Sequence, residues 1–352
     1  MTYCLGWKYG GSVYLIADSA ATGFAHPHAA RSSFDELHDS VRGEFVQESL
    51  LKLVRLSDKR AATYSGDVAI ATDLLSILKQ RCEYGDSIQI ALTSAAASVG
   101  PFTSERPVSL LIAEHGEQGP SLKLWHSVQP GDISEVAIGE IGSLQTYHSD
   151  FAKTALSLLC RGNIEERRLL PIVSAVVQTY GVHDNLIQQN IGGLIFGLQV
   201  CSEGVVWQED TNYFLYPDTI SPLTYVSAFA RDDVVVVNSS VTNATSCFSN
   251  SVNTVEISEW FGKWDGYIQS HINSNNYRYW VFISSARKVI TIVRLEDLTA
   301  DNQYFSLTFQ GNGKFDLGIS PTLRDALLAP IDPQGHDAIP FRLKFLNGKP
   351  TR

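Results

Sequence analysis

Residues 2–22 read TYCLGWKYGGSVYLIADSAAT and contain two mainly apolar segments, 3–9 and 12–17, with two glycines between them. A glycine pair between two such segments is typical of a β-hairpin turn. The stretch therefore predicts two antiparallel strands that begin almost at the first residue. In such a hairpin the end of the second strand, at Asp18, returns to the start of the first strand, at Thr2.

The composition of the chain describes a globular protein and excludes some functions. Its 352 residues suffice for about two domains, and 44% are hydrophobic. The net charge of −10 argues against a main role in binding nucleic acid or an anionic membrane, since both need a basic surface. The apolar runs are much shorter than the roughly 20 residues of a membrane-spanning helix, and no signal sequence is expected.

The cysteines and histidines give no sign of a metal site. Five widely spaced cysteines, without a Cys-x-x-Cys pair, favour reduced thiols and a cytoplasmic location. His26 and His28, in the motif HPH, lack a neighbouring carboxylate or thiol pattern. We therefore expect no metal and no cofactor.

The rest of the first part of the chain alternates between strands and helices. We expect a long loop or a partly helical insertion over 19–50. After it we expect, in order, a hairpin at 50–56 and 60–66, helices at 67–85 and 86–100, strands at 107–116 and 121–128, helices at 147–161 and 164–180, and strands at 191–201 and 204–216. Helix pairs packed between two sheets would satisfy this order.

After residue 217 the sequence changes to short alternating segments with Asn and Ser turns. These segments predict a smaller β-rich domain with one amphipathic helix at 258–271, preceded by a strand in NTVEIS. The predicted domains are therefore 1–216 and 217–352.

Thr2 becomes chemically interesting if Met1 is removed, as is usual before a small residue. It then carries a hydroxyl group and a free α-amine, whose ordinary pKa is about 7.7–8.0. Such an amine can act as the general base for its own hydroxyl. Without further support, however, Thr2 would be an ordinary residue after the initiator methionine.

The stretch 2–22 resembles the start of mature proteasome β-type subunits, and in style their bacterial homologues of the HslV and Anbu groups. These proteins are N-terminal-nucleophile (Ntn) hydrolases. Without a gap, Thr2 matches the nucleophile of that family, Asp18 its active-site aspartate, and Thr22 a threonine that binds the substrate backbone.

The resemblance extends over roughly residues 2–215. With one insertion within 23–50, Lys52 in LLKLVRL matches the active-site lysine of the family. Gly66 in TYSGDVAIA then matches the oxyanion-hole glycine at the family's own spacing. The resemblance implies a four-layer αββα sandwich for this part, followed by the smaller β-rich domain.

Two later stretches depart from the family pattern. The family's Gly-Ser-Gly turn corresponds to AIGEIGS, which places Glu140 or Ser143 near that position as accessory residues. The family's Asp-x-x-Ser-Gly-Gly segment corresponds to QQNIGG, with Gln188 at the aspartate and Ile191 at the serine. Those two polar groups normally tune the threonine amine.

The resemblance implies a threonine-type peptidase or amidase that acts on a peptide or protein and needs no cofactor. Thr2 would attack the amide, Lys52 and Asp18 would support it, and Gly66 would stabilise the oxyanion. It also implies a homo-oligomeric ring or spiral and allows a separate ATPase partner. The alternative is a catalytically silent Ntn-fold assembly or binding subunit, suggested by the departures at Gln188 and Ile191.

Overall fold

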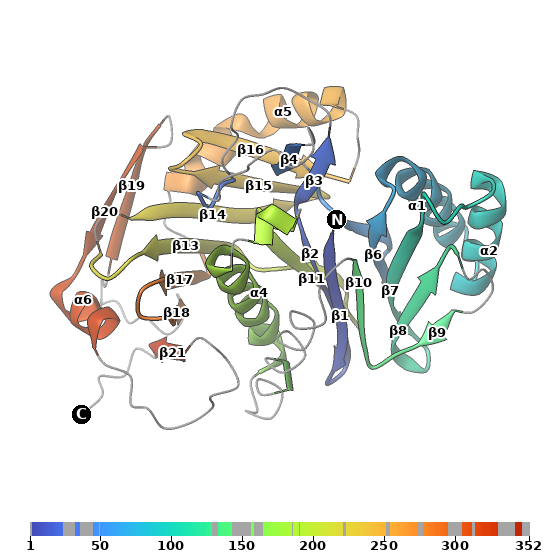
Figure 1. The fold of residues 1–352 in the computed structure, drawn as a ribbon, viewed down its shortest axis with the longest axis horizontal. Coiled ribbons are helices and arrows are strands. Elements are labelled where there is room, and N and C mark those ends of the chain that lie inside the picture. The colour runs from blue at the N-terminus through green and yellow to red at the C-terminus, as the bar shows by residue number, and fades with distance from the viewer. Residues whose placement is uncertain are drawn as a thin grey trace.

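The computed structural model shows a mixed α/β protein whose largest elements are three sheets flanked by helices (Figure 1). The mixed character agrees with the fold class expected from the sequence. The structure describes residues 2–23, 32–35, 45–48, 50–128, 133–142, 156–157, 165–184, 186–189, 191–220, 223–250, 254–273, 277–294, 305–311, 314–329 and 342–346.

The predicted N-terminal hairpin is present and lies in the middle of the first sheet. Its two strands pair antiparallel from Cys4 opposite Ala17 to Tyr9 opposite Ser12. At the turn Gly10 has a φ of +56°, which a glycine adopts without steric cost. The strand order is β10-β1-β2-β11-β12. The strands are β1 Tyr3–Tyr9, β2 Ser12–Asp18, β10 Ile138–Gly142, β11 Ile195–Cys201 and β12 Gly204–Trp207.

The second sheet, with the order β5-β6-β7-β8-β9, carries a pair of helices on its outer face (Figure 1). Asp67 and Ser87 cap the N-termini of these helices, which is why each helix begins where it does. The elements are β5 Leu53–Ser57, β6 Arg60–Gly66, α1 Val68–Glu83, α2 Ile88–Val99, β7 Val108–Gly116, β8 Gly119–His126 and β9 Ser134–Glu135.

These two sheets pack directly against each other. Leu5 and Leu15 of the first sheet share one buried cluster with Leu111 and Leu122 of the second. The helices therefore lie outside the pair of sheets, and the expectation of helices between them was wrong. The order of elements along the chain does not reveal which face of a sheet a helix covers.

One long helix, α4 (Glu166–His183), covers the other face of the first sheet. It corresponds to the helix predicted at 164–180 and contains Pro171 near its start. The helix predicted at 147–161 lies outside the described residues except for 156–157. Buried residues of α4, such as Leu169 and Val173, share their cluster with strands of the third sheet as well.

The third sheet has seven strands in the order β16-β15-β14-β13-β17-β18-β21, with β13–β17 and β18–β21 parallel. The segment 204–216, predicted as one strand region, is divided here, because β12 belongs to the first sheet and β13 to the third. The predicted domain boundary after residue 216 falls between the paired strands β13 and β14. The strands are β13 Thr211–Tyr216, β14 Thr224–Arg231, β15 Val234–Ser239, β16 Ala244–Ser249, β17 Tyr279–Ser284, β18 Val289–Arg294 and β21 Arg342–Leu346.

Smaller elements complete the described structure. Strands β3 and β4 pair with each other near the two ends of the segment 19–50, which was predicted as a long loop or a partly helical insertion, so that prediction was wrong at both ends. The segment NTVEIS, predicted as a strand, forms the start of α5 from Thr254 onward. These elements are β3 Ala20–Gly23, β4 Phe45–Glu48, η1 Leu186–Gln189, α5 Thr254–Asn273, β19 Phe305–Gly311, β20 Lys314–Ile319 and α6 Pro321–Leu328.

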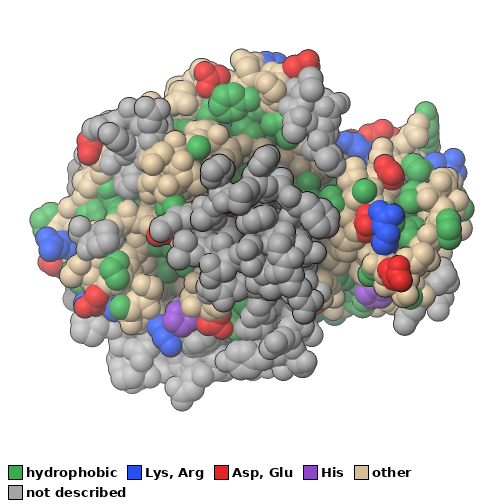
Figure 2. Space-filling view, turned by 45° about the horizontal axis from the view of Figure 1, so that its top comes forward, with side chains coloured by type: hydrophobic (Ala, Val, Ile, Leu, Met, Phe, Trp, Pro, Cys, Tyr) green, Lys and Arg blue, Asp and Glu red, His purple; other side chains and the backbone are tan. Residues whose placement is uncertain are grey.

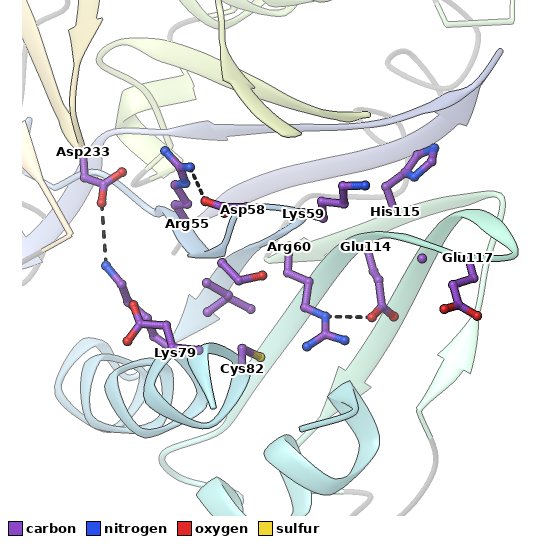
Figure 3. A pocket seen from close by; sticks show the side chains of 14 residues that line it. Arg55, Asp58, Lys59, Arg60, Lys79, Cys82, Glu114, His115, Glu117 and Asp233 are labelled. Atoms are coloured by element: carbon purple, nitrogen blue, oxygen red, sulfur yellow. Dashed lines mark hydrogen bonds and ion pairs between the residues drawn. The ribbon is translucent and has the colours of Figure 1, made fainter. Parts of the chain in front are cut away.

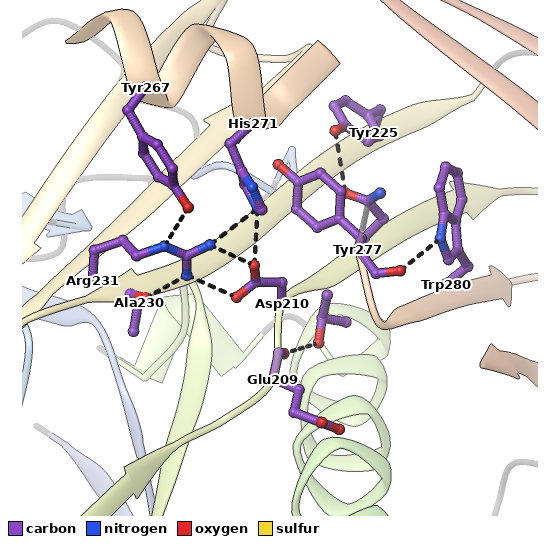
Figure 4. A network of polar contacts seen from close by, with 11 residues as sticks. Glu209, Asp210, Tyr225, Ala230, Arg231, Tyr267, His271, Tyr277 and Trp280 are labelled. Atoms are coloured by element: carbon purple, nitrogen blue, oxygen red, sulfur yellow. Dashed lines mark hydrogen bonds and ion pairs between the residues drawn. The ribbon is translucent and has the colours of Figure 1, made fainter. Parts of the chain in front are cut away.

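A polar network holds α5 against the third sheet (Figure 4). The Arg231 guanidinium donates to both carboxylate oxygens of Asp210, at 3.1 and 2.9 Å, and His271 of α5 lies 2.8 Å from the same carboxylate. Burial opposes ionisation of Asp210, but the hydrogen bonds from His271 and Arg231 outweigh it and lower its pKa. Arg231 also donates to the Tyr267 hydroxyl of α5. The network therefore fixes the position of the helix.

The surface carries charges of both signs. On the face drawn in Figure 2, acidic and basic side chains lie beside one another at the right of the view. Among the helices that the structure describes, none combines the length and apolarity that spanning a bilayer demands.

The shared core predicts that a buried residue of α4, Leu169, stabilises the packing of this helix between the first and third sheets. Leu169→Ala should lower the free energy of unfolding by about 2–5 kcal/mol, because a fully buried leucine leaves a cavity. Urea denaturation followed by tryptophan fluorescence should still show one transition. The exposed Ile90→Ala is the control. A loss below about 1 kcal/mol would contradict the shared core.

Candidate active site

Asp18 is the centre of the hydrogen bonds at the start of the chain. It ends β2, next to the first residues of β1, and its Oδ1 accepts a hydrogen bond from the Tyr3 backbone N–H at 3.0 Å. Its Oδ2 accepts another from the Gly192 N–H at 3.2 Å. One carboxylate therefore fixes the residue after Thr2 and the loop before β11.

Lys52 forms a buried ion pair with Asp18. The Lys52 ammonium lies 2.7 Å from Asp18 Oδ1, and both side chains are at most 1% exposed. Lys52 also donates to the backbone carbonyl of Ala20. A buried charge is tolerated only when it is paired and hydrogen-bonded, and here both partners meet that condition.

Thr2, Lys52 and Gly66 line a single pocket of about 680 Å³. Thr2 itself is 7% exposed and lies at the edge between the two packed sheets. Lys52 reaches the pocket just before β5, and Gly66 at the end of β6. The structure thus brings together three residues that the sequence predicted, with Asp18 directly behind them.

Gly66 occupies a position that admits only glycine. Its φ is +107°, and a Cβ atom there would lie 1.9 Å from the carbonyl oxygen of Pro107. The backbone of Gly66 can therefore face the pocket without a side chain in the way.

The residue of β10 that lines the pocket is Gly142 and not the predicted accessory residue Glu140. Gly142 pairs with Tyr3, has a φ of +110°, and would place a Cβ atom 1.7 Å from the Thr2 carbonyl oxygen. Glu140 is not among the described lining residues. Burial raises the pKa of Tyr3 well above its ordinary value, and the neighbouring Glu140 carboxylate raises it further. The predicted accessory Ser143 lies outside the described residues.

The loop 191–194 contains the residues that the sequence comparison aligned with a serine-glycine-glycine segment. Ile191 is 1% exposed and packs in the main core. Gln188 lies in the short helix η1, with its side chain outside the described residues. Thr22 pairs with Val46 in the β3–β4 ribbon, and its side chain is likewise outside them.

Two further residues that support this loop were not predicted. Glu48 accepts hydrogen bonds from the N–H groups of Leu194 at 2.7 Å and Ser33 at 2.8 Å. Gln178 of α4 donates to the Gly193 carbonyl and accepts from the Ile195 N–H. A glutamine within an apolar helical stretch is a sequence signal that could have indicated Gln178, whereas nothing around Glu48 indicates its partners.

Cys4 of β1 lies near Asp18 and Lys52, but its surroundings disfavour a role as a nucleophile. Its thiol donates to the Tyr64 carbonyl at 3.3 Å. Burial raises its pKa to about 12, despite the opposing charge of Lys52. A reactive cysteine needs its thiolate form, which this environment disfavours. Within the part of the chain that the structure describes, no group of three or more His, Cys, Asp or Glu side chains could hold a metal ion.

A second cavity, of about 790 Å³, has a different character (Figure 3). Its charged side chains largely pair with one another: Arg60 with Glu114 at 2.7 Å, and Lys79 with Asp233 at 3.7 Å. Burial raises the pKa of its one thiol, Cys82. The cavity therefore presents no activated nucleophile among its lining residues, and the Thr2 pocket is the better candidate.

No protein-family model matches the chain, and a comparison with curated proteins finds no match.

The buried ion pair gives a prediction for stability. Lys52→Met should lower the free energy of unfolding by about 3–5 kcal/mol, because it leaves the Asp18 carboxylate buried without a cation. The double variant with Asp18→Asn should recover part of this loss. Arg106→Met removes the partly exposed pair with Asp67 and should cost far less in urea denaturation. An equal loss of unfolding free energy in Lys52→Met and Arg106→Met would contradict the prediction.

Glu48 gives a prediction for pH dependence. Burial raises its pKa, against the opposing hydrogen bonds from Ser33 and Leu194, so the folded protein binds the proton more tightly than the unfolded chain. The stability from this group is present below its unfolded pKa of about 4.3 and is lost as the pH rises through the folded pKa.

Glu48→Gln cannot titrate and should therefore gain stability relative to the wild type as the pH rises from about 4 toward neutrality. Urea denaturation across this range measures the difference. Glu117→Gln, at an exposed position, controls for the loss of one carboxylate. A difference between Glu48→Gln and the wild type that does not change with pH would contradict the assignment.

Proposed function

We propose that this protein is an N-terminal-threonine hydrolase that cleaves amide bonds in peptides or proteins. The observation that carries the proposal is the shared pocket of Thr2, Lys52 and Gly66, with Asp18 hydrogen-bonded both to Lys52 and to the residue after Thr2. The proposal requires that Met1 is removed, so that Thr2 has a free amine.

The reaction would proceed through an acyl-enzyme. The Thr2 hydroxyl oxygen attacks the substrate carbonyl while the Thr2 amine takes the hydroxyl proton. The Gly66 N–H stabilises the resulting oxyanion. The amine then returns the proton to the leaving nitrogen as the C–N bond breaks. A water molecule, deprotonated by the same amine, releases the acyl group and restores the threonine hydroxyl.

Lys52 would favour the neutral form of the Thr2 amine. A positive charge close by disfavours a second one and lowers the pKa of an amine. Asp18 keeps Lys52 in position through the 2.7 Å ion pair. Asp18 and Lys52 are therefore positioning and electrostatic groups, while Thr2 forms and breaks the bonds.

The packing of layers supports an Ntn-type αββα sandwich. The layers follow one another in the order α1 and α2, second sheet, first sheet and α4 (Figure 1). The two sheets pack on each other, and each has helices on its other face. Both central sheets are antiparallel. We extend the proposal to a cytoplasmic homo-oligomeric ring or spiral that encloses the sites, with any ATPase supplied by a separate protein.

A catalytically silent Ntn-fold subunit is the second candidate. It is supported by Ile191, an apolar and fully buried residue where the family carries a serine. If Met1 is retained, the Thr2 nitrogen remains an amide and only the silent candidate stands, which intact-mass spectrometry of the purified protein shows. If Met1 is removed, the labelling of Thr2 described next separates the two candidates.

Covalent labelling tests the nucleophile. A β-lactone that acylates activated hydroxyl groups should add its mass to the wild type and to Thr2→Ser, but not to Thr2→Ala, because only the first two offer a hydroxyl beside a free amine. Peptide mapping should place the adduct on residue 2. Thr93→Ala, on the exposed face of α2, is the matched control and should be labelled normally. Unchanged labelling of Thr2→Ala would refute the proposal.

A further inference from the structure

A row of polar side chains crosses the second sheet next to the candidate site. Ser65 of β6 lies opposite Ser109 of β7, and Ser109 lies opposite His126 of β8. Directly opposed residues of neighbouring strands point to the same face of a sheet. We refer to Ser65, Ser109 and His126 as the polar row.

The polar row lies on the face that meets the first sheet. Ala61, in alternation with Ser65, and Leu111, in alternation with Ser109, both belong to the core that the two sheets share. Ser65 and Ser109 also line the pocket that contains Thr2. Ser65 immediately precedes Gly66, so a substrate carbonyl held at Gly66 would lie next to the row.

The hydroxyl groups of the row are available to a ligand. The Ser109 hydroxyl lies 2.7 Å from His126 Nδ1, which fixes its direction and leaves further hydrogen-bonding capacity toward the pocket. Ser65 is 6% exposed, and its hydroxyl has no hydrogen-bond partner within the part of the chain that the structure describes. Ser65 lines the pocket, so a ligand bound there can supply a partner for its hydroxyl.

The charged groups of the pocket, by contrast, are already paired. Lys52 is held by Asp18, and Arg106 lies 2.7 Å from Asp67. Asp67 in addition caps α1 through the Ile70 N–H. The described lining therefore offers a substrate hydrogen bonds without an uncompensated charge.

We infer that the pocket selects a neutral, hydrogen-bonding side chain, with the carboxamide of glutamine as the best match, on the residue whose carbonyl Thr2 attacks. This inference rests on the proposed function. A carboxamide presents one acceptor and two donor hydrogens, which two serine hydroxyls can satisfy together. The small apolar lining residues, including Ala20, Val68 and Ala69, can contact its methylene groups.

Other side chains of similar size fit less well. Methionine has the length of glutamine but cannot hydrogen-bond to either serine, so Ser109 would keep only His126 and Ser65 would gain no partner from the ligand. Polar groups that a ligand leaves unpaired give strong discrimination. Glutamate would meet no unpaired positive charge among the described lining residues, because Lys52 is paired with Asp18 and Arg106, through its Nε, with Asp67. A comparison of glutamine with methionine therefore tests hydrogen bonding at equal size, and a comparison of glutamine with glutamate tests the effect of charge.

Three peptide epoxyketones that differ only in glutamine, methionine or glutamate next to the reactive group provide the test. The threonine hydroxyl adds to the ketone and the free amine opens the epoxide, so the whole reagent is retained. The purified full chain is incubated with each reagent, and intact mass gives the rate of labelling. We expect the glutamine reagent to label about tenfold faster, or more, than either of the others.

The outcomes separate this inference from the proposed function. If none of the three reagents labels the protein, the proposed function fails and the inference fails with it. If all three label at similar rates, or if the methionine or glutamate reagent is fastest, the threonine hydrolase stands and the inference is overturned.

Variants of the row identify the residues responsible. Ser65→Ala and Ser109→Ala should each bring the ratio of glutamine to methionine labelling toward one. His126→Leu should lower the same ratio, because the Ser109 hydroxyl then loses the group that orients it. Ser98→Ala, on the exposed end of α2, should keep the wild-type ratio. A ratio unchanged in all three row variants would overturn the assignment.

Discussion

The buried ion pair between Asp18 and Lys52 is the constraint on which the candidate site depends. Transferring two charges from water costs several kcal/mol for each ion, and their attraction repays this only when geometry and hydrogen bonding are complete. Here Asp18 also accepts from two backbone N–H groups, and Lys52 donates to the Ala20 carbonyl. Well-packed apolar residues could replace such a pair at little loss of stability. Its presence is therefore better explained by what it positions, namely the backbone next to Thr2.

Two glycines that line the pocket leave the backbone around Thr2 open to a ligand. Gly66 and Gly142 both have positive φ angles, and a Cβ atom at either would collide with a backbone carbonyl, of Pro107 and of Thr2 respectively. The second sheet contributes one of these glycines and the first sheet the other. The pocket thus opens at the seam of two packed sheets, where close backbone approach, rather than large side chains, determines its shape.

The sequence predicted what depends on local pattern. Alternation and turn glycines gave the β1–β2 hairpin, and the helical spacing of apolar residues gave α1. Asp18, Lys52 and Gly66 were assigned through the resemblance to the proteasome-type family, and each lies on or next to a short hairpin. Contacts between distant segments were not predictable in this way. Glu48, in β4, reaches the loop before β11, and the NTVEIS segment, despite its β-branched residues, is helical from Thr254 onward.

The third sheet is tied to the site by direct hydrogen bonds as well as by the shared core. The Leu51 N–H, immediately before Lys52, donates to the Ser249 carbonyl at the end of β16. The Ser239 hydroxyl donates to the Ser33 carbonyl at 2.6 Å, and the Ser33 N–H in turn donates to Glu48. Lys52 and the loop 191–194 are thus each supported from the C-terminal half. Because an active site tolerates only small displacements of its groups, this half contributes to the geometry of the Thr2 pocket in addition to any binding role of its own.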